Sequence, residues 1–456
     1  MSKQNNLTDF LTDVANAIRA KKGSTDLINP QNFSAEIASL SGGLEIVDMT
    51  ETTATIEPNK VYVWGMVESL NITLGASTDD SDFFAFRFRC SKPTMTSLTV
   101  NGATWADDTE LDEVGKPVLD LGSWYQCEIK GGTSALYARL AHYIPFEDSN
   151  VEAVLLAKGV GDGLGVTYKD AAKVTSISTW FKGNADITAF SEFVNFSGIS
   201  GLVLYAFQNC TSLAEITFPG SLTSIEDSAF QNCSTLAEIT FPGSLTSIGG
   251  TAFENCTSLA EITLPASLTS IGNYAFNGCS SLTRVVNLEN TKVTSISVAA
   301  FRNCTSLAEV TLPAGVISIG NGAFQGTSFE EITFPASLTS IGSSFYSCKK
   351  LKRVINIENT QLTIINHQAF YGCSTLAEIT FPGSLTSIGN YAFFSCTSLQ
   401  YIRIEATTPP TLSATNAIPS TIGAIYVPDE SVAAYQSATN WSSFASKIKG
   451  ISEMPA

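Results

Sequence analysis

Histidine and closely paired cysteines, two common sources of catalytic and metal-binding chemistry, are scarce in this sequence. Its 456 residues include two histidines, His142 and His367, and no two cysteines lie at the two-residue spacing of a zinc site. A Gly-x-Ser-x-Gly nucleophile motif is also missing. We therefore expect the protein not to be an enzyme and to hold neither a metal nor another cofactor.

The sequence also has few positively charged residues and no long apolar run. Lys and Arg total 25 against 42 Asp and Glu, which gives a net charge of −17. A chain this acidic has little with which to neutralise phosphates, so we expect no nucleic-acid partner. No apolar run approaches the roughly 18 residues that a membrane span needs, and residues 1–10 lack the apolar core of a signal peptide. Export by the general secretory route is therefore not expected.

One phrase, in contrast, is repeated many times. From about Leu222 it reads Leu-Thr-Ser-Ile, a variable stretch with Ala-Phe, a Cys, and then Leu-Ala-Glu-Ile-Thr-Phe-Pro. Its phenylalanines recur mostly every 23 residues, with two steps of 25 and one of 21, at Phe207, Phe230, Phe253, Phe276, Phe301, Phe324, Phe345, Phe370 and Phe393. This period predicts a mainly β solenoid with two short strands in each coil. The predicted core set of one coil is Leu222, Ile225, Phe230, Leu236 and Ile239.

Eight of the ten cysteines share one position of the repeat, three residues after the phenylalanine. They are Cys210, Cys233, Cys256, Cys279, Cys304, Cys348, Cys373 and Cys396. We interpret them as a buried column of small thiols, since Cys behaves as a small apolar residue in a core. Stacked coils about 5 Å apart bring such sulfurs near bonding range, but we expect them to stay reduced.

The first 43 residues differ from the rest of the chain. Apolar residues recur at helical spacing between Leu7 and Ile18, and a second short helix is predicted at 30–37. Residues 9–23 and 28–37 resemble the N-terminal segment of many phage and prophage tail or fibre proteins. The resemblance implies attachment to other tail or baseplate proteins of a virion. Because so short a segment cannot bury a core alone, we also expect it to self-associate, with a trimer favoured.

Residues 44–131 alternate polar and apolar residues in short stretches and predict a small β-sandwich that acts as a spacer. Residues 132–172 read as a linker and lead-in to the solenoid, with a possible strand at 151–156. The glycine-rich stretch 159–165 fits no phosphate-loop pattern and reads as a turn. From Val174 to Phe181 the sequence resembles a degraded first repeat.

The repeated phrase closely resembles the bacterial leucine-rich repeats of the BspA type, over about residues 173–405. Residues 406–456 resemble the terminal cap of that family, in which a last strand is followed by a helix that covers the open end. The resemblance implies a leucine-rich-repeat solenoid and a role in adhesion, with binding of a protein or a glycan.

One repeat position carries a column of carboxylates that we call the acidic column. It consists of Glu215, Glu238, Glu261, Glu309, Glu331 and Glu378. Arg284, Arg353 and Arg403 are expected to interrupt this column and to compensate its charge, because carboxylates about 5 Å apart repel by ~1 kcal/mol even in water. A solvated polar face and a site for cationic partners are both open interpretations.

A second repeat position, directly after the core phenylalanine, changes from polar to aromatic along the chain. It holds Gln208, Gln231, Glu254, Asn277, Arg302 and Gln325 in the early coils, and then Tyr346, Tyr371 and Phe394. With Tyr391 nearby, these aromatic residues are candidate ligand-binding residues that stack on sugars or anchor a protein. Packing against the cap or a neighbouring subunit is the alternative.

These observations together predict a non-enzymatic virion protein, a phage tail or fibre component. Its solenoid would bind a glycan or protein on the host cell surface. The alternative is a leucine-rich-repeat adhesin that is secreted or lies on the bacterial cell surface.

Overall fold

The computed structural model describes residues 45–49, 53–56, 60–67, 70–74, 84–90, 98–101, 104–105, 124–132, 135–161 and 165–455. The predicted N-terminal helices, with the tail attachment and trimer inferred from them, lie outside these residues. The chain divides into two compact units, with Thr175 as the first residue of the second.

The first unit is built mainly from strands, in one sheet of order β1-β3-β5-β8-β9-β7 and another of order β2-β4-β6. Its strands are β1 (Glu45–Met49), β2 (Thr53–Ile56), β3 (Lys60–Val67), β4 (Leu70–Leu74), β5 (Phe84–Cys90), β6 (Leu98–Asn101), β7 (Thr104–Trp105), β8 (Trp124–Gly132) and β9 (Ala135–Tyr143). Of the neighbouring pairs, β5-β8 and β8-β9 are antiparallel and the rest are parallel.

Two expectations for the predicted linker are wrong. Strand β9 falls inside it and pairs with β8 over their whole length. The predicted strand at 151–156 is instead part of helix α3 (Ser149–Ala157), whose N-cap Asp148 accepts a hydrogen bond from the Asn150 amide at 2.8 Å. Val151 and Leu155, four residues apart, share the buried side of this helix. Helix α4 (Tyr168–Lys173) follows and ends just before the second unit.

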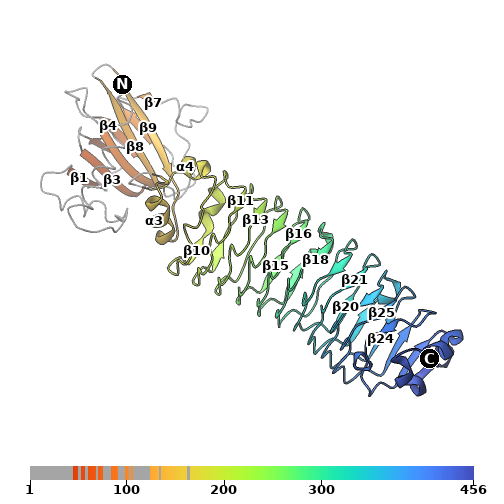
Figure 1. Cartoon of the computed structure of the whole chain (residues 1–456). Helices are drawn as coiled ribbons and strands as arrows, with labels where there is room; N and C mark the ends of the chain where they lie inside the picture. The colour runs from red at the N-terminus through yellow and green to blue at the C-terminus, as the bar shows by residue number, and fades with distance from the viewer. Residues whose placement is uncertain are drawn as a thin grey trace. The chain divides into compact units, whose positions relative to one another are not determined.

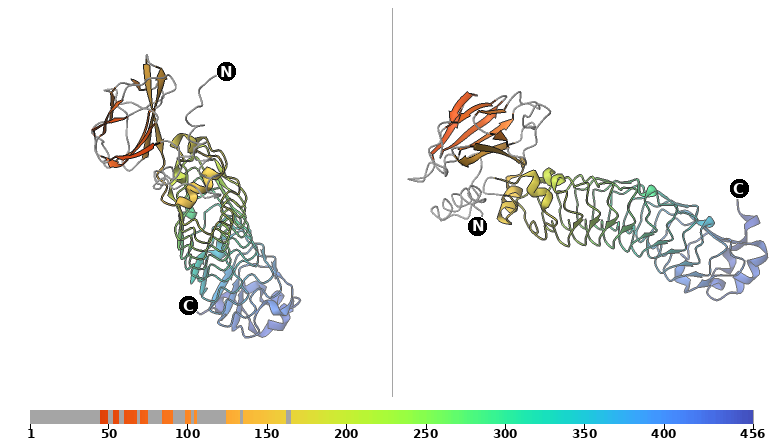
Figure 2. Two further views of the ribbon diagram at one scale, coloured as in Figure 1. Left: turned by 90° about the vertical axis from the view of Figure 1, so that its left-hand side faces the viewer. Right: turned by 90° about the horizontal axis from the view of Figure 1, so that it is seen from above.

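The second unit is a solenoid whose coils stack along one axis (Figure 1, Figure 2). Each coil contributes a two-residue strand, most often Ser-Ile, to one side of the solenoid, in parallel sheets of four and six strands. These strands are β11 (Gly201–Leu202), β13 (Ser224–Ile225), β14 (Ser247–Ile248), β16 (Ser270–Ile271), β18 (Ser295–Ile296), β19 (Ser318–Ile319), β21 (Ser340–Ile341), β23 (Ile364–Ile365), β25 (Ser387–Ile388) and β27 (Thr411–Leu412).

A second set of parallel strands runs through the other half of the coils. It comprises β10 (Ala189–Phe190), β12 (Glu215–Ile216), β15 (Glu261–Thr263), β17 (Arg284–Val286), β20 (Glu331–Thr333), β22 (Arg353–Ile355), β24 (Glu378–Phe381), β26 (Tyr401–Ile404), β28 (Ala424–Val427) and β29 (Ile448–Gly450). The two 25-residue steps hold extra 3-10 turns, η2 (Leu288–Asn290) and η3 (Ile357–Asn359). The remaining 3-10 turns are η1 (Ser191–Asn195), η4 (Thr415–Ala417), η5 (Asp429–Ser431), η6 (Trp441–Lys447) and η7 (Ile451–Glu453).

The predicted core set is confirmed, because its five members are all buried, with Ile239 the most exposed at 6%. Its centre is a column of stacked phenylalanine rings, which we call the phenylalanine column. The column begins in the degraded first repeat, where Phe181 stacks on Phe207 at 5.2 Å between ring centroids. It continues to Phe393 with centroid distances between 5.1 and 5.8 Å. Burying each ring contributes roughly 1.5–3 kcal/mol, but only when a neighbouring coil covers it.

The eight repeat cysteines are buried, as predicted, and their thiols also have a polar role. Each thiol donates a hydrogen bond, at 2.9–3.2 Å, to the backbone carbonyl of the column phenylalanine one coil earlier. The coil that lacks this cysteine carries Thr327 at the same position, and its hydroxyl lies 3.4 Å from the Cys348 sulfur. The Thr327 hydroxyl donates to the Phe324 carbonyl of its own coil at 2.8 Å, so the bond to the preceding coil is made by the cysteines.

Alkaline pH should destabilise the solenoid through these thiols. Burial raises the pKa of Cys279 to about 12 and that of Cys348 to about 11, from an ordinary value of 9.0. Stability from this source is fully present below pH 9, and it declines as the pH rises toward 12, because the unfolded thiols then ionise while the folded ones do not. Urea unfolding at pH 7.5, 9 and 10.5 should show a falling free energy of unfolding.

A Cys279→Ser variant is the matched control, since a hydroxyl can still donate to the Phe253 carbonyl and does not titrate in this range. Between pH 9 and 11 the free energy of unfolding should fall less steeply for the variant than for the parent. The two slopes should differ by about 1.4 kcal/mol per pH unit, the contribution of one thiol. Equal slopes for the two proteins would show that the Cys279 thiol does not cause the loss of stability at alkaline pH.

The last fifty residues pack on the end of the solenoid. Strands β28 and β29 continue the sheet beyond β26, and helix α5 (Val432–Ser437) follows β28. Buried Tyr435 donates a hydrogen bond to the Ala406 carbonyl at 2.8 Å, and buried Trp441 donates to the Pro410 carbonyl at 2.7 Å. These contacts satisfy backbone groups that the final coil has no further coil to pair with.

Ending the chain at Glu405 should therefore expose the apolar interior of the last coil. We expect a lower melting temperature and aggregation, measured by calorimetry and light scattering. A Trp441→Phe variant keeps most of the ring but loses one hydrogen bond, so it should cost only about 1–3 kcal/mol. A truncated protein that stays monomeric with an unchanged melting temperature would show that these residues do not act as a cap.

Candidate functional site

The acidic column lies on the strands that carry the Glu-Ile-Thr part of the repeat. Parallel pairing sets Glu261 beside Arg284 and Glu331 beside Arg353. The prediction that Arg403 interrupts the same column is wrong, because Glu378 pairs with Tyr401 and Arg403 lies two residues further along β26. The Tyr401 hydroxyl donates a hydrogen bond to the Glu378 carboxylate. Burial, together with this carboxylate, raises the Tyr401 pKa to about 12.

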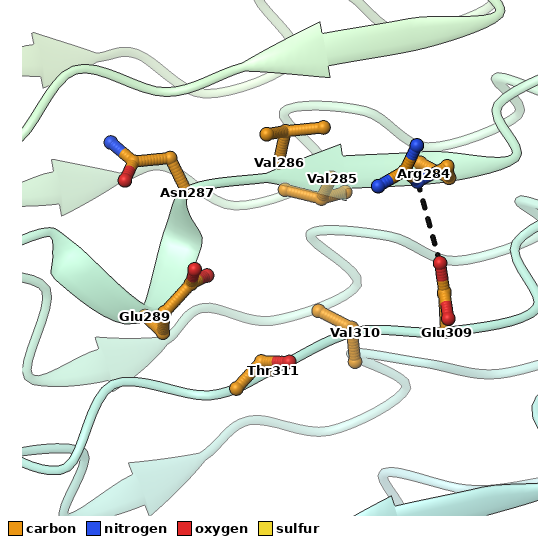
Figure 3. Close-up of a pocket in the computed structure, with 8 residues that line it drawn as sticks. All are labelled: Arg284, Val285, Val286, Asn287, Glu289, Glu309, Val310 and Thr311. Atoms are coloured by element: carbon orange, nitrogen blue, oxygen red, sulfur yellow. Dashed lines mark ion pairs between the residues drawn. The ribbon is translucent and has the colours of Figure 1, made fainter.

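Arginine compensates the charge of the column at two places. Arg284 lies 3.6 Å from Glu261 and 3.3 Å from Glu309, and Arg353 lies 2.9 Å from Glu331. Figure 3 shows the first of these places, a small polar depression where Arg284 on β17 reaches Glu309. Glu289 on turn η2 lines the same depression but does not join the ion pair. Arg403 pairs outside the column, with Glu405 at 2.6 Å.

The acidic column is therefore a row of exposed carboxylates that are partly neutralised in place. Within the described residues, no group of three His, Cys, Asp or Glu side chains is arranged to hold a metal ion. The interpretation as a solvated polar face needs no further ligand, and the use of the column by a cationic partner stays a prediction.

The aromatic residues after the column phenylalanines come together as one stack, which we call the aromatic stack. Tyr346 and Tyr371 have ring centroids 4.7 Å apart and nearly parallel planes, and Tyr371 and Phe394 are 5.4 Å apart. Tyr391 meets Phe394 edge-on at 5.5 Å, and His367 meets Tyr391 edge-on at 5.8 Å. Phe394 is 40% exposed, and the two tyrosines of the stack are half-buried.

This geometry changes how the aromatic stack can bind a ligand. The Tyr371 ring stacks on Tyr346 and on Phe394, so it has no free face for a sugar, and ligand binding by these residues stays a prediction. Each stacked pair contributes about 0.5–1.5 kcal/mol to the fold beyond its area burial. Within the stack, only Tyr346 and Phe394 have a ring face that no other member of the stack covers.

A surface depression lies at each end of the stack. One, of about 430 Å³, is lined by Tyr346 together with Tyr274, Arg302 and Gln325, and we call it the Arg302 depression. The other, of about 520 Å³, is lined by Phe394 together with Asn416, Ile418 and Phe444, and we call it the Phe394 depression. The amide oxygen of Asn416 is buried there without a hydrogen-bond partner. The aromatic stack thus joins two concave places on the same row of turns.

The polar residues of this row are also connected, through hydrogen bonds between their side chains that the sequence pattern alone did not reveal. The Gln231 amide donates to Glu254 at 2.6 Å, and the Asn277 amide donates to the other oxygen of Glu254 at 2.8 Å. Arg302 follows at the next position of the row. We call this chain of side-chain hydrogen bonds the polar ladder. The sequence shows its members as polar residues directly after the earlier column phenylalanines, but it does not show which side chains bond, because that depends on their rotamers.

The turn that presents this row needs an unusual backbone. The residue two places after the phenylalanine has a positive φ in most coils, as in Asn209 at 62° and Asn303 at 57°. Asn tolerates this left-handed conformation better than most residues, and Gly adopts it without strain, which explains Gly278 and Gly326 at the same position. The row of side chains is therefore held on tight turns that repeat in register.

Catalytic chemistry finds no support among the described residues. His367 is exposed and contacts Tyr391, while His142 lies on β9 in the other unit. None of the helices that the structure describes is both long and apolar enough to cross a membrane.

Comparison with known proteins identifies the repeats. The family model "BspA type Leucine rich repeat region" matches in six copies, over residues 200–292, 286–400 and 353–413. No curated protein sequence matches the chain.

Several solved structures are similar to this chain. A leucine-rich repeat protein from Bacteroides ovatus ATCC 8483 is 25% identical, with 60% of this chain and 86% of that chain covered and a TM-score of 0.38. The T. pallidum leucine rich repeat protein is 32% identical over 32% of this chain and 67% of that one, with a TM-score of 0.29. A leucine rich cell surface protein from Faecalibacterium prausnitzii A2-165 is 22% identical over 47% and 82%, with a TM-score of 0.23.

The period, the buried core set and the family match agree with one another. The repeat region of this chain belongs to the BspA-type leucine-rich repeat family.

Proposed function

We propose that this protein is a bacterial leucine-rich-repeat adhesin, secreted or on the cell surface, which acts by binding and not by catalysis. The family match supports this proposal, because the resemblance to BspA-type repeats implies adhesion. The competing virion role depends on residues 1–43, which the family match does not reach. No comparison supports a phage tail or fibre component, so we prefer the adhesin.

The observation that carries the proposal is the aromatic stack with a depression at each end. Tyr346 and Phe394 each have one ring face that no other member of the stack covers, and each lines a depression with polar side chains. Sugar recognition commonly combines an apolar ring face with nearby hydrogen-bonding groups, and two depressions on one row of turns can hold separate units of one sugar chain. We therefore propose an extended surface glycan as the ligand, with a protein as the alternative.

Loss of the two end rings should abolish most of this binding. The full-length chain and its Tyr346→Ala/Phe394→Ala variant would be applied to a printed array of neutral and acidic oligosaccharides. Large aromatic anchors commonly contribute at least 2 kcal/mol each, so removing even one should weaken binding roughly thirtyfold. The affinity for the best-bound oligosaccharide is then measured by calorimetric titration.

Two variants serve as controls in the same experiment. Gln208→Ala changes the same repeat position at the far end of the row and should leave binding unchanged. Tyr371→Phe keeps the covered middle ring and should have little effect. Full binding by the double variant, with its fold intact by circular dichroism, would remove the stack from the site. An array without signal, in a protein that binds a purified surface protein, would replace the glycan by a protein ligand.

A further inference from the structure

We propose that the Arg302 depression is a subsite for the carboxylate of an acidic sugar, such as a uronic or sialic acid unit within a longer glycan. This inference rests on the proposed function and adds the chemical class of one unit of its ligand. It depends on the unusual position of one arginine in a very acidic chain.

Arg302 differs from the other arginines of the solenoid. Residues 165–455 contain four arginines, and Arg284, Arg353 and Arg403 all form ion pairs with glutamates. Arg302 forms no ion pair and no side-chain hydrogen bond with any described residue. Its Nε is buried without a partner, as is the Nε of Arg403, so the missing ion pair is what distinguishes Arg302. A guanidinium presents five N–H donors, and a cation left without an acceptor in a partly buried place is costly.

The one carboxylate on the same row is already occupied. Glu254 lies two coils away and accepts hydrogen bonds from Gln231 and Asn277, one on each of its oxygens. The Asn277 amide oxygen, one coil from Arg302, is also buried without a partner. Hydrogen-bonding capacity is therefore unmet at Asn277 and Arg302, two neighbouring positions of the polar part of the row.

The lining of the depression fits an acidic sugar. Arg302 is the one charged residue among its ten lining residues, so the local charge is positive although the chain carries −17. Tyr274 and Tyr346 supply aromatic surface, and Asn321, Gln325, Ser343 and Gln368 supply donors and acceptors for hydroxyl groups. The planar fork of a guanidinium matches a carboxylate in two parallel hydrogen bonds. A sugar that carries a carboxylate uses all three of these features at once.

The test compares matched oligosaccharides that differ in the negative charge. The pairs are galacturonate oligomers with and without methyl esterification, and sialylated lactosamine with and without its sialic acid. The full-length protein should bind the acidic member of at least one pair about tenfold more tightly, with a preference that weakens in high salt. In an Arg302→Gln variant this preference should disappear, and Arg302→Lys should restore part of it.

Arg284→Gln is the matched control, since Arg284 is already paired with Glu261 and Glu309 and lies outside the depression. It should keep the full preference for the acidic member. Equal binding of both members of every pair, or a preference that survives Arg302→Gln, would overturn the subsite.

The two proposals fail in different ways. Neutral oligosaccharides bound through Tyr346 and Phe394, without any acid preference, would refute the subsite and leave the proposed function in place. An acid preference that depends on Arg302 but not on the two end rings would refute the role of the aromatic stack and keep the subsite.

Discussion

Every coil of the solenoid depends on its neighbours to cover one phenylalanine ring and to satisfy its backbone. The Phe207 amide donates to the Ala229 carbonyl of the next coil, and the Cys233 thiol donates to the Phe207 carbonyl. The rings of Phe207 and Phe230 then stack at 5.1 Å. Because these three contacts recur in register, a single coil is unstable while a stack of coils is a continuous core.

This register also builds the surface. A residue at one position of the repeat lies next to the residue at the same position of the next coil. Residues of one kind at that position therefore form a continuous row along the surface of the solenoid. Polar residues in that row form the ladder around Glu254, and aromatic residues form the stack from Tyr346 to Phe394. In the polar part of the row, the Asn277 amide oxygen and the Arg302 Nε are buried without hydrogen-bond partners.

Insertions decide where the regular pattern is interrupted. The turn η2 lies in a coil two residues longer than the usual one, and the Ser-Ile sheet breaks between β16 and β18 in the same coil. The similar turn η3 is tolerated without a break, since β21 and β23 remain paired. Spacing in the sequence revealed both longer steps, but it could not show which of them would open the sheet, because that depends on strand pairing across coils.

The sequence by itself determined the period, the core set, the thiol position and the two surface rows, because a repeat puts equivalent residues in equivalent environments. The usual 23-residue step from Glu378 leads to Tyr401, so the misplacement of Arg403 was an error of interpretation that the register of β24 and β26 corrects. The sequence could not show that the Tyr371 ring is covered on both faces or that Arg302 lacks a carboxylate, because ring orientation and ion pairing depend on side-chain rotamers. Only the tertiary structure decided these points, because each depends on how side chains from neighbouring coils pack against one another.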